Sequence, residues 1–198
     1  MNITASTMET RAVFSDDGTH RYLLEKVWEP EKPRLGIIML APSTATDILF
    51  DSTTLQVLNN VSRLGYGSVS ILNLFARLDD FALKHAEDTD EENLKMIAEV
   101  IGRCDTLVYA PGVGKAGSRA FQMRQEQVLQ LLKPFEDKLF CISNEKGNVR
   151  LMHPLCPQVR VWKLSPFQVS ELLPEENVTE PAQKPQEPKR PGRPRKNP

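Results

Sequence analysis

The stretch LGIIMLAPSTATD, residues 35–47, joins an apolar run to a polar loop that opens with Ala41-Pro42-Ser43. The apolar part, Leu35–Leu40, has the length of a β-strand and little alternation, which is typical of a strand buried on both faces. Three further runs have the same character, namely Val69–Leu72, Thr106–Ala110 and Leu139–Ile142. The chain therefore contains four candidate strands for the interior of one sheet.

Segments with helical periodicity lie between these runs. The apolar face of the first contains Leu55, Leu58, Val61 and Leu64, and that of the second contains Leu94, Ile97, Ala98 and Ile101. A capping box of Thr89 and Glu92 opens the second helix. A third helical segment covers about Arg119–Leu132. This alternation predicts an α/β fold, a three-layer sandwich with a central, mainly parallel four-stranded sheet.

The two ends of the chain differ from this pattern. Arg11–Phe14 and His20–Trp28, separated by a turn at residues 16–18, predict an N-terminal hairpin that flanks the sheet. From residue 174 the chain has no apolar periodicity and is rich in Pro, Glu, Gln, Lys and Arg, a composition that cannot bury enough surface to fold. We expect an α/β domain over residues 1–173 and a disordered tail over 174–198.

The net charge of -1 hides an uneven distribution. Residues 181–198 contain six Lys and Arg residues and one Glu, so this segment is +5 and the remainder of the chain is -6. An acidic body attracts phosphates poorly. If the protein acts on nucleic acid, the tail therefore supplies much of the nonspecific attraction.

No apolar run approaches the roughly 18 residues that span a bilayer, and the first ten residues lack a signal-peptide profile. We expect a cytoplasmic protein without a membrane partner. Each of the three cysteines, Cys104, Cys141 and Cys156, lies in or beside an apolar segment, which is typical of reduced thiols packed as small hydrophobic groups.

Polar motifs follow three of the four candidate strands. Ala41-Pro42-Ser43 follows the first, Asn73 ends the second, and His153-Pro154-Leu155 comes after the fourth. Ligands of such sheets bind beyond the carboxyl ends of the strands. The sequence thus predicts a site at this edge, with Phe50-Asp51 close behind the first motif.

These motifs, in this order, resemble the signature loops of the uracil-DNA glycosylase superfamily over about residues 20–165. They are also similar to a bacterial and phage family of unknown function that has Asn-Pro-Ser-Thr-Ala and His-Pro-Leu loops. The resemblance implies a monofunctional DNA glycosylase that flips a modified or damaged base and hydrolyses its N-glycosidic bond, leaving an abasic site.

The resemblance also implies roles for individual residues. Asp51 would stabilise positive charge on the sugar and position a water molecule, and His153 would stabilise the negative charge on the departing base. Asn73 would read the edge of the flipped base, and Phe50 would stack on its face. The remaining substrate-binding residues would be Ala41, Pro42, Ser43 and Pro154.

The sequence departs from the superfamily at Ala41, where many members carry a catalytic Asp or Asn. It resembles a branch that shares this substitution and uses an Asp after a downstream Phe-containing stretch, and this resemblance implies Asp51 as the carboxylate. Asp47 is the rival carboxylate, and Asp51 is also a candidate helix cap. Asn73 and His153 each have a purely structural interpretation as loop residues. Two other functions stay open: a noncatalytic DNA-binding module, and a nucleotide-processing enzyme.

The end of the tail, Lys189-Arg-Pro-Gly-Arg-Pro-Arg-Lys196, resembles an AT-hook. We expect Arg190, Arg193, Arg195 and Lys196 to contact the narrow minor groove of A·T-rich DNA. The Gly that precedes the first loop in the superfamily and the Ser that follows its His-Pro pair are both missing here, which points to a base other than uracil, such as the modified pyrimidines of phages. Repair and antiphage defence both stay open as the biological role. We expect a monomer without a metal or organic cofactor, because three unclustered cysteines cannot hold an iron–sulfur cluster.

Overall fold

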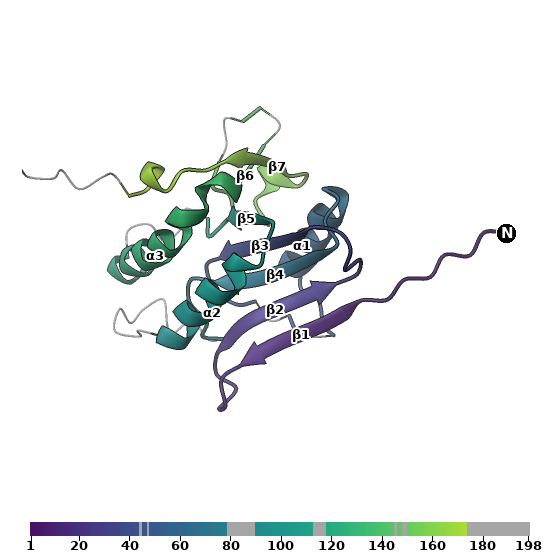
Figure 1. Cartoon of the computed structure of the whole chain (residues 1–198), viewed down its shortest axis with the longest axis horizontal. Coiled ribbons are helices and arrows are strands. Elements are labelled where there is room, and N and C mark those ends of the chain that lie inside the picture. The colour runs from purple at the N-terminus through teal and green to yellow at the C-terminus, as the bar shows by residue number, and fades with distance from the viewer. Residues whose placement is uncertain are drawn as a thin grey trace, which may run out of the picture.

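The computed structural model describes residues 1–43, 45–46, 48–78, 90–112, 118–144, 146–147 and 150–173. Within these residues the chain forms one sheet of seven strands and three α-helices (Figure 1). The strands are β1 (Glu9–Phe14), β2 (Arg21–Val27), β3 (Arg34–Met39), β4 (Ser68–Asn73), β5 (Thr106–Tyr109), β6 (Leu139–Ser143) and β7 (Lys163–Pro166). The helices are α1 (Ser52–Arg63), α2 (Glu91–Gly102) and α3 (Arg119–Leu132), with short 3-10 helices at Lys133–Lys138, Pro157–Val159 and Val169–Glu171.

The order of the strands in the sheet is β1-β2-β4-β3-β5-β6-β7. The four central strands, β4, β3, β5 and β6, are mutually parallel, as their buried apolar sequences predict. Their carboxyl ends therefore lie at one edge of the sheet, where Met39 is the register partner of Asn73 and Ile38 that of Tyr109.

The outer parts of the sheet correct two expectations. The N-terminal hairpin does not merely flank the sheet, because β2 pairs with β4 in antiparallel register and so adds two strands to it. The strand β7, which the sequence analysis did not predict, pairs antiparallel with β6 at the opposite edge. It is four residues long and ends at a proline, features tolerated at an edge where one side of the strand needs no partner.

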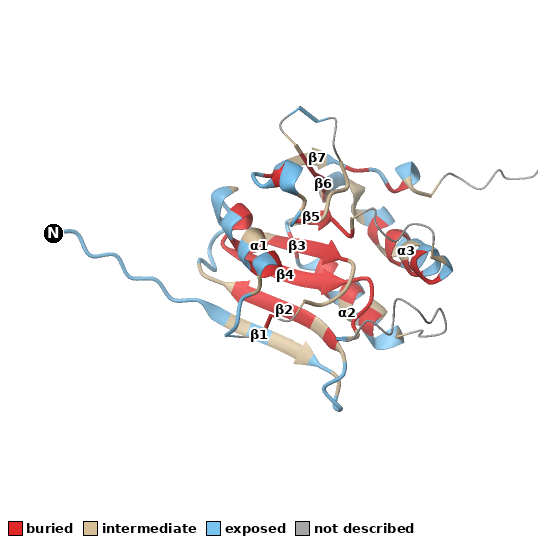
Figure 2. Ribbon diagram, turned by 180° about the vertical axis from the view of Figure 1, so that it is seen from behind, coloured by how far each residue is buried: buried red, intermediate tan, exposed pale blue. Residues whose placement is uncertain are grey.

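Helices cover both faces of the sheet (Figures 1 and 2). Val57, Leu58 and Val61 of α1 pack on one face, whereas α2 and α3 pack on the other. The prediction of the apolar face of α1 is partly wrong. Leu55, which is predicted to lie on this face, is 46% exposed, and Val57 is buried beside Leu58 and Val61 instead. Figure 2 shows that the central strands are buried and that β1 at the edge is not.

The predicted capping box of α2 also needs correction. The helix begins one residue later, and its N-cap is Asp90, whose Oδ1 accepts a hydrogen bond from the backbone N–H of Asn93 at 3.1 Å. Thr89 lies outside the described residues. The bounds of α3 agree with the prediction, because Leu132 is followed by Lys133 and Pro134, which cannot continue an α-helix.

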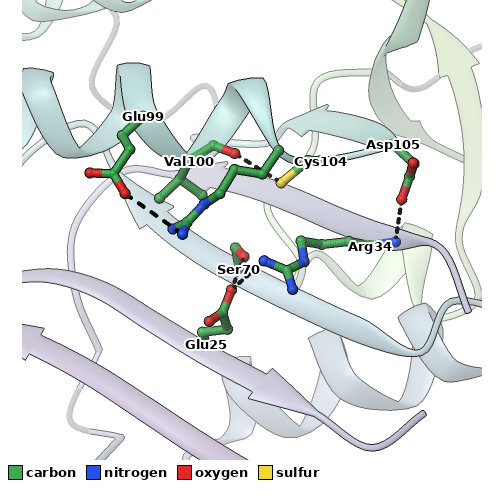
Figure 3. Close-up of polar contacts among 8 residues, drawn as sticks. Glu25, Arg34, Ser70, Glu99, Val100, Cys104 and Asp105 are labelled. Atoms are coloured by element: carbon green, nitrogen blue, oxygen red, sulfur yellow. Dashed lines mark hydrogen bonds and ion pairs between the residues drawn. The ribbon is translucent and has the colours of Figure 1, made fainter. Parts of the chain in front are cut away.

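A cluster of polar side chains lies toward the amino ends of the strands, on the face covered by α2 (Figure 3). Glu25 accepts hydrogen bonds from Arg34 Nη1 and Ser70 Oγ, both at 3.0 Å, through the same Oε1 atom.

Nearby, Cys104 is buried and donates to the carbonyl of Val100. Burial raises the pKa of this thiol to about 11, so Cys104 stays protonated and acts as a packing residue.

No helix within the described part of the chain is long and apolar enough to cross a membrane. The three cysteines are free thiols, as predicted, with Cys104 and Cys141 buried. The predicted tail, residues 174–198, lies outside the described residues.

Candidate active site at the carboxyl edge of the sheet

Segments that follow three parallel strands come together at the carboxyl edge. Asp51, beyond β3, and His153, beyond β6, are close enough for the charge of Asp51 to act on the imidazole. Gly112, beyond β5, packs against His153: a Cβ at Gly112 would lie 3.1 Å from the Cβ of His153. Residues about 100 positions apart in the sequence thus share one site.

Asp51 is the N-cap of α1. Its Oδ1 accepts a hydrogen bond from the backbone N–H of Thr54 at 2.8 Å, so the predicted capping role is confirmed. The second carboxylate oxygen accepts no hydrogen bond from the described residues. The cap therefore fixes the carboxylate at the edge of the sheet and leaves one oxygen for another partner.

His153 is held in one orientation by its own loop. Its Nδ1 accepts a hydrogen bond from the backbone N–H of Leu155 at 3.2 Å, which assigns the proton of the neutral ring to Nε2. Burial lowers the pKa of His153, and the carboxylate of Asp51 opposes that shift. The ring is therefore a neutral donor through Nε2 at physiological pH.

The backbone near His153 is unusual. Leu151 has a φ of 57°, in the left-handed region that side chains with a Cβ rarely adopt. Gly112 has a φ of 77°, which glycine tolerates, and its missing Cβ makes room for His153. Strained backbone of this kind persists where the surrounding structure holds it, and it clusters at functional sites.

Asn73 ends β4, as the sequence predicts, and its residue is 2% exposed. Its side-chain Nδ2 is buried and has no hydrogen-bond partner among the described residues. Its backbone carbonyl accepts a hydrogen bond from Nδ2 of Asn93 in α2 at 3.0 Å. Helix α2, which covers the face of the sheet away from α1, therefore fixes the end of β4. A buried amide donor without an acceptor costs free energy in the unliganded protein, which indicates a binding role.

Arg21 is the functional candidate that the sequence analysis missed. It is the first residue of β2 and only 2% exposed, and its Nη1 donates to the backbone carbonyls of Ser43, at 3.3 Å, and Ala45. Burial lowers the pKa of this guanidinium, and Asp51 opposes the shift. The sequence signal was weak, because an arginine at the start of a predicted strand next to a hairpin turn is usually a solvated residue.

The other predicted residues lie in varied surroundings. Ala41, Pro42 and Ser43 are half-buried in the loop after β3, and Pro154 is buried. The ring of Phe50 is 40% exposed and lies 4.2 Å from the Nζ of Lys26 in β2, so its stacking role stays a prediction. Two sets of residues fall outside the described chain: the rival carboxylate Asp47, and the tail residues Arg190, Arg193, Arg195 and Lys196.

Within the described ranges, no group of three or more His, Cys, Asp and Glu side chains is placed to hold a metal ion. The site instead combines a neutral imidazole, a carboxylate, a buried amide and a buried guanidinium. Such a set can stabilise charge of both signs and can recognise acceptor groups of a ligand.

No curated protein and no solved structure matches the chain. Residues 21–155 match the family described as "Protein of unknown function (DUF1643)". The matched segment begins at Arg21 and includes Asp51, Asn73, Gly112 and His153, so it contains every residue of the site described above. Since it covers more than half of the sequence, the chain belongs to the DUF1643 family.

Proposed function

We propose that this protein is a DNA glycosylase that flips a modified or damaged base out of the duplex and hydrolyses its N-glycosidic bond. The observation that carries the proposal is the placement of Asp51 and His153 at the sheet edge where Asn73 ends β4 with a buried donor that has no acceptor among the described residues. Cleavage of this bond builds positive charge on the sugar and negative charge on the base. The site holds a group suited to each.

Asp51 is suited to the sugar. Its Oδ1 is used by the helix cap, which fixes the carboxylate, and its other oxygen is left to face the positive charge or to orient the attacking water. Because the cap holds the side chain before substrate binds, little reorganisation is needed during the reaction.

His153 is suited to the departing base. A neutral imidazole that donates from Nε2 stabilises a developing oxyanion without having to transfer a proton. Asn73 would donate from Nδ2 to an oxygen on the edge of the base, and the loop of Ala41, Pro42 and Ser43 would contact the flipped nucleotide.

A second candidate function is a noncatalytic DNA-binding module with the same pocket. The helix cap accounts for Asp51 without any chemistry, and Ala41 has no catalytic group to offer. A nucleotide-processing enzyme is a third candidate, against which the basic tail argues, since a small substrate has no need of it.

Single-turnover assays on duplex oligonucleotides test these alternatives. The panel contains deaminated, oxidised and bulky modified pyrimidines, and alkali cleavage reveals abasic sites. Asp51→Asn preserves the helix cap, because Asn is an equally good N-cap residue. We expect this variant to bind DNA but to release base roughly 10²–10⁴-fold more slowly.

Asp90→Asn is the matched control, because it makes the same change at the N-cap of α2. It should leave the rate unchanged. Binding without base release from any oligonucleotide would support the noncatalytic module. Cleavage of free nucleosides but not of duplex DNA would support the nucleotide-processing enzyme.

The basic tail is proposed as a second DNA contact. Removing residues 181–198 takes away six cations and should weaken DNA binding, with a shallower dependence on salt. The loss should be largest on A·T-rich duplexes, and Arg193→Ala should reproduce much of that selectivity loss. An affinity that is unchanged at low and high salt would exclude the tail from binding.

A further inference from the structure

Two buried donors at the carboxyl edge lack acceptors. Arg21 and Asn73 are each 2% exposed, and Arg21 Nη2 and Asn73 Nδ2 have no hydrogen-bond partner among the described residues. Trp28 and Trp162 also have unpaired buried N–H groups, but those indoles are neutral. Arg150, which has an unpaired Nε, is neutralised by its ion pair with Glu171. The pair formed by Arg21 and Asn73 is distinct because it includes a buried charge.

The topology brings these two donors together. Strand β4, which ends at Asn73, lies between β2 and β3. The backbone N–H of Arg21 donates to the carbonyl of Ala76, three residues beyond Asn73, at 2.8 Å. Its side chain reaches the carbonyls of Ser43 and Ala45 beyond β3, so the guanidinium lies at the carboxyl edge where β4 ends.

A β-bulge sets the direction of the arginine. Val13 pairs with Leu23 and Phe14 pairs with Arg21, which leaves Tyr22 as an extra residue in β2. An extra residue reverses the alternation of side chains. Leu23 packs on the face covered by α2 and α3, whereas Arg21 contacts Ala45, which belongs to the core under α1. Val69 and Ile71 of β4 pack in that same core, so Asn73 also lies on the α1 face.

The guanidinium is incompletely compensated. Its Nη1 is bonded to neutral carbonyls, and Asp51 acts on it from a distance without forming an ion pair. A buried charge needs a charged or strongly polar partner. A water molecule would accept from both donors, but it would not balance the charge.

We infer that Arg21 Nη2 and Asn73 Nδ2 together bind one anionic oxygen of the ligand. This inference rests on the proposed function and deepens it: the oxygen is that of the departing base, which becomes anionic as the glycosidic bond breaks. Both donor atoms are shielded from bulk solvent, so the oxygen that reaches them is carried in by a bound ligand. Arg21 is then a substrate-binding residue that favours the charged state of the base.

Calorimetric binding of two free bases to the full-length chain tests the inference. Uracil is neutral near pH 7, whereas barbiturate is a pyrimidine of similar shape that carries a negative charge on its oxygens. The wild type should bind barbiturate at least about tenfold more tightly than uracil, the size of one charge-assisted hydrogen bond. Arg21→Met should remove this preference, and Arg21→Lys should retain part of it.

Arg63→Met is the matched control, since Arg63 also donates to a backbone carbonyl, that of Trp162 at 2.8 Å, but from the last turn of α1. It should keep the preference. If Arg21→Met does not fold, Asn73→Asp decides the question, because a carboxylate at this position should weaken barbiturate binding more than uracil binding.

Three results would overturn the inference: equal affinity of the wild type for the two bases, no binding of either base, or a preference that survives in folded Arg21→Met. Displacement of DNA by inorganic phosphate, with no effect of barbiturate, would assign the donors to a backbone phosphate and also overturn it. The proposed function fails separately. An Arg21-dependent preference without base release from any DNA would keep the anion site and remove the glycosylase.

Discussion

The two ends of the sheet treat buried polar groups in different ways. At the amino end, Arg34 donates to Glu25, Ser70 donates to the same carboxylate, and the backbone N–H of Arg34 donates to Asp105 at 2.8 Å (Figure 3). At the carboxyl end, Arg21 and Asn73 each keep a donor without an acceptor. The polar side chains of the amino-end cluster therefore find partners within the chain, whereas Arg21 and Asn73 keep unpaired donors that we propose serve a ligand.

His153→Ala gives the largest expected effect and sharpens this comparison. Loss of one oxyanion donor costs about 2.7–4 kcal/mol, so the single-turnover rate of base release should fall roughly 10²–10³-fold. The midpoint of urea unfolding should change little. His20→Ala is the control. Among the described residues, the ring of His20 forms a hydrogen bond only with Thr19 in the N-terminal hairpin. A rate within threefold of the wild type would make His153 structural.

Glu25→Ala should produce the opposite pattern at the amino end. It leaves Ser70 and Arg34 without their shared acceptor, which should lower the free energy of unfolding by about 1–3 kcal/mol in urea titrations. A loss of free energy of unfolding near the lower end of this range is expected, because the side chain of Arg34 is 31% exposed and its ion pair is screened by solvent. The rate of base release on saturating DNA should stay the same. If that rate collapsed while the protein stayed folded, the amino-end cluster would also serve catalysis, and the assignment of stability to one end of the sheet and of catalysis to the other would be wrong.

Gly112→Ala tests whether the packing around His153 matters beyond stability. Gly112 has a φ of 77° and Gly18 has a φ of 69°, so Ala at either position should cost about 1–2 kcal/mol of backbone strain. Only at Gly112 does the new Cβ meet another side chain, that of His153 at 3.1 Å. Gly112→Ala should therefore slow base release roughly tenfold, and Gly18→Ala should not. Equal rates in the two variants would contradict the close packing.

The smallest expected effect is the pH dependence of stability. Burial lowers the pKa of His153 in the folded protein, so the unfolded chain binds more protons at this residue. The free energy of unfolding should therefore fall as the pH drops below the ordinary pKa of histidine, and level off below the folded pKa. His153→Gln should flatten this part of the profile. A wild-type profile as flat as that of the variant would show that His153 is not buried as a neutral ring.

Much of the fold was predictable because periodicity and capping are local properties. The four central strands and three helices agree with the predictions, and α3 does so at both ends. The strand β7 was missed because KLSP is short, alternates poorly and ends in Pro166, so only its pairing with β6 identifies it. The hairpin was predicted, but its place as two strands of the main sheet depends on long-range pairing with β4.

The candidate site divides in the same way. The sequence predicted that Asn73 and His153 lie at this edge, because parallel strands bring their carboxyl ends together and this rule needs only the order of the elements. The sequence also offered the cap at Asp51. It could not show the partners of those residues. Whether a side chain is a cap, a ligand contact or both depends on the neighbours that folding provides.

The sequence by itself determined the alternation of strands and helices, the parallel order of the centre and the residues at its carboxyl edge, because these follow from local patterns of apolar and polar residues. Only the tertiary structure decided the role of Arg21. One extra residue at Tyr22 turns this arginine to the α1 face, where its side chain donates to carbonyls of the loop after β3. A bulge depends on pairing between strands, so its effect on a side chain arises only when the sheet has formed.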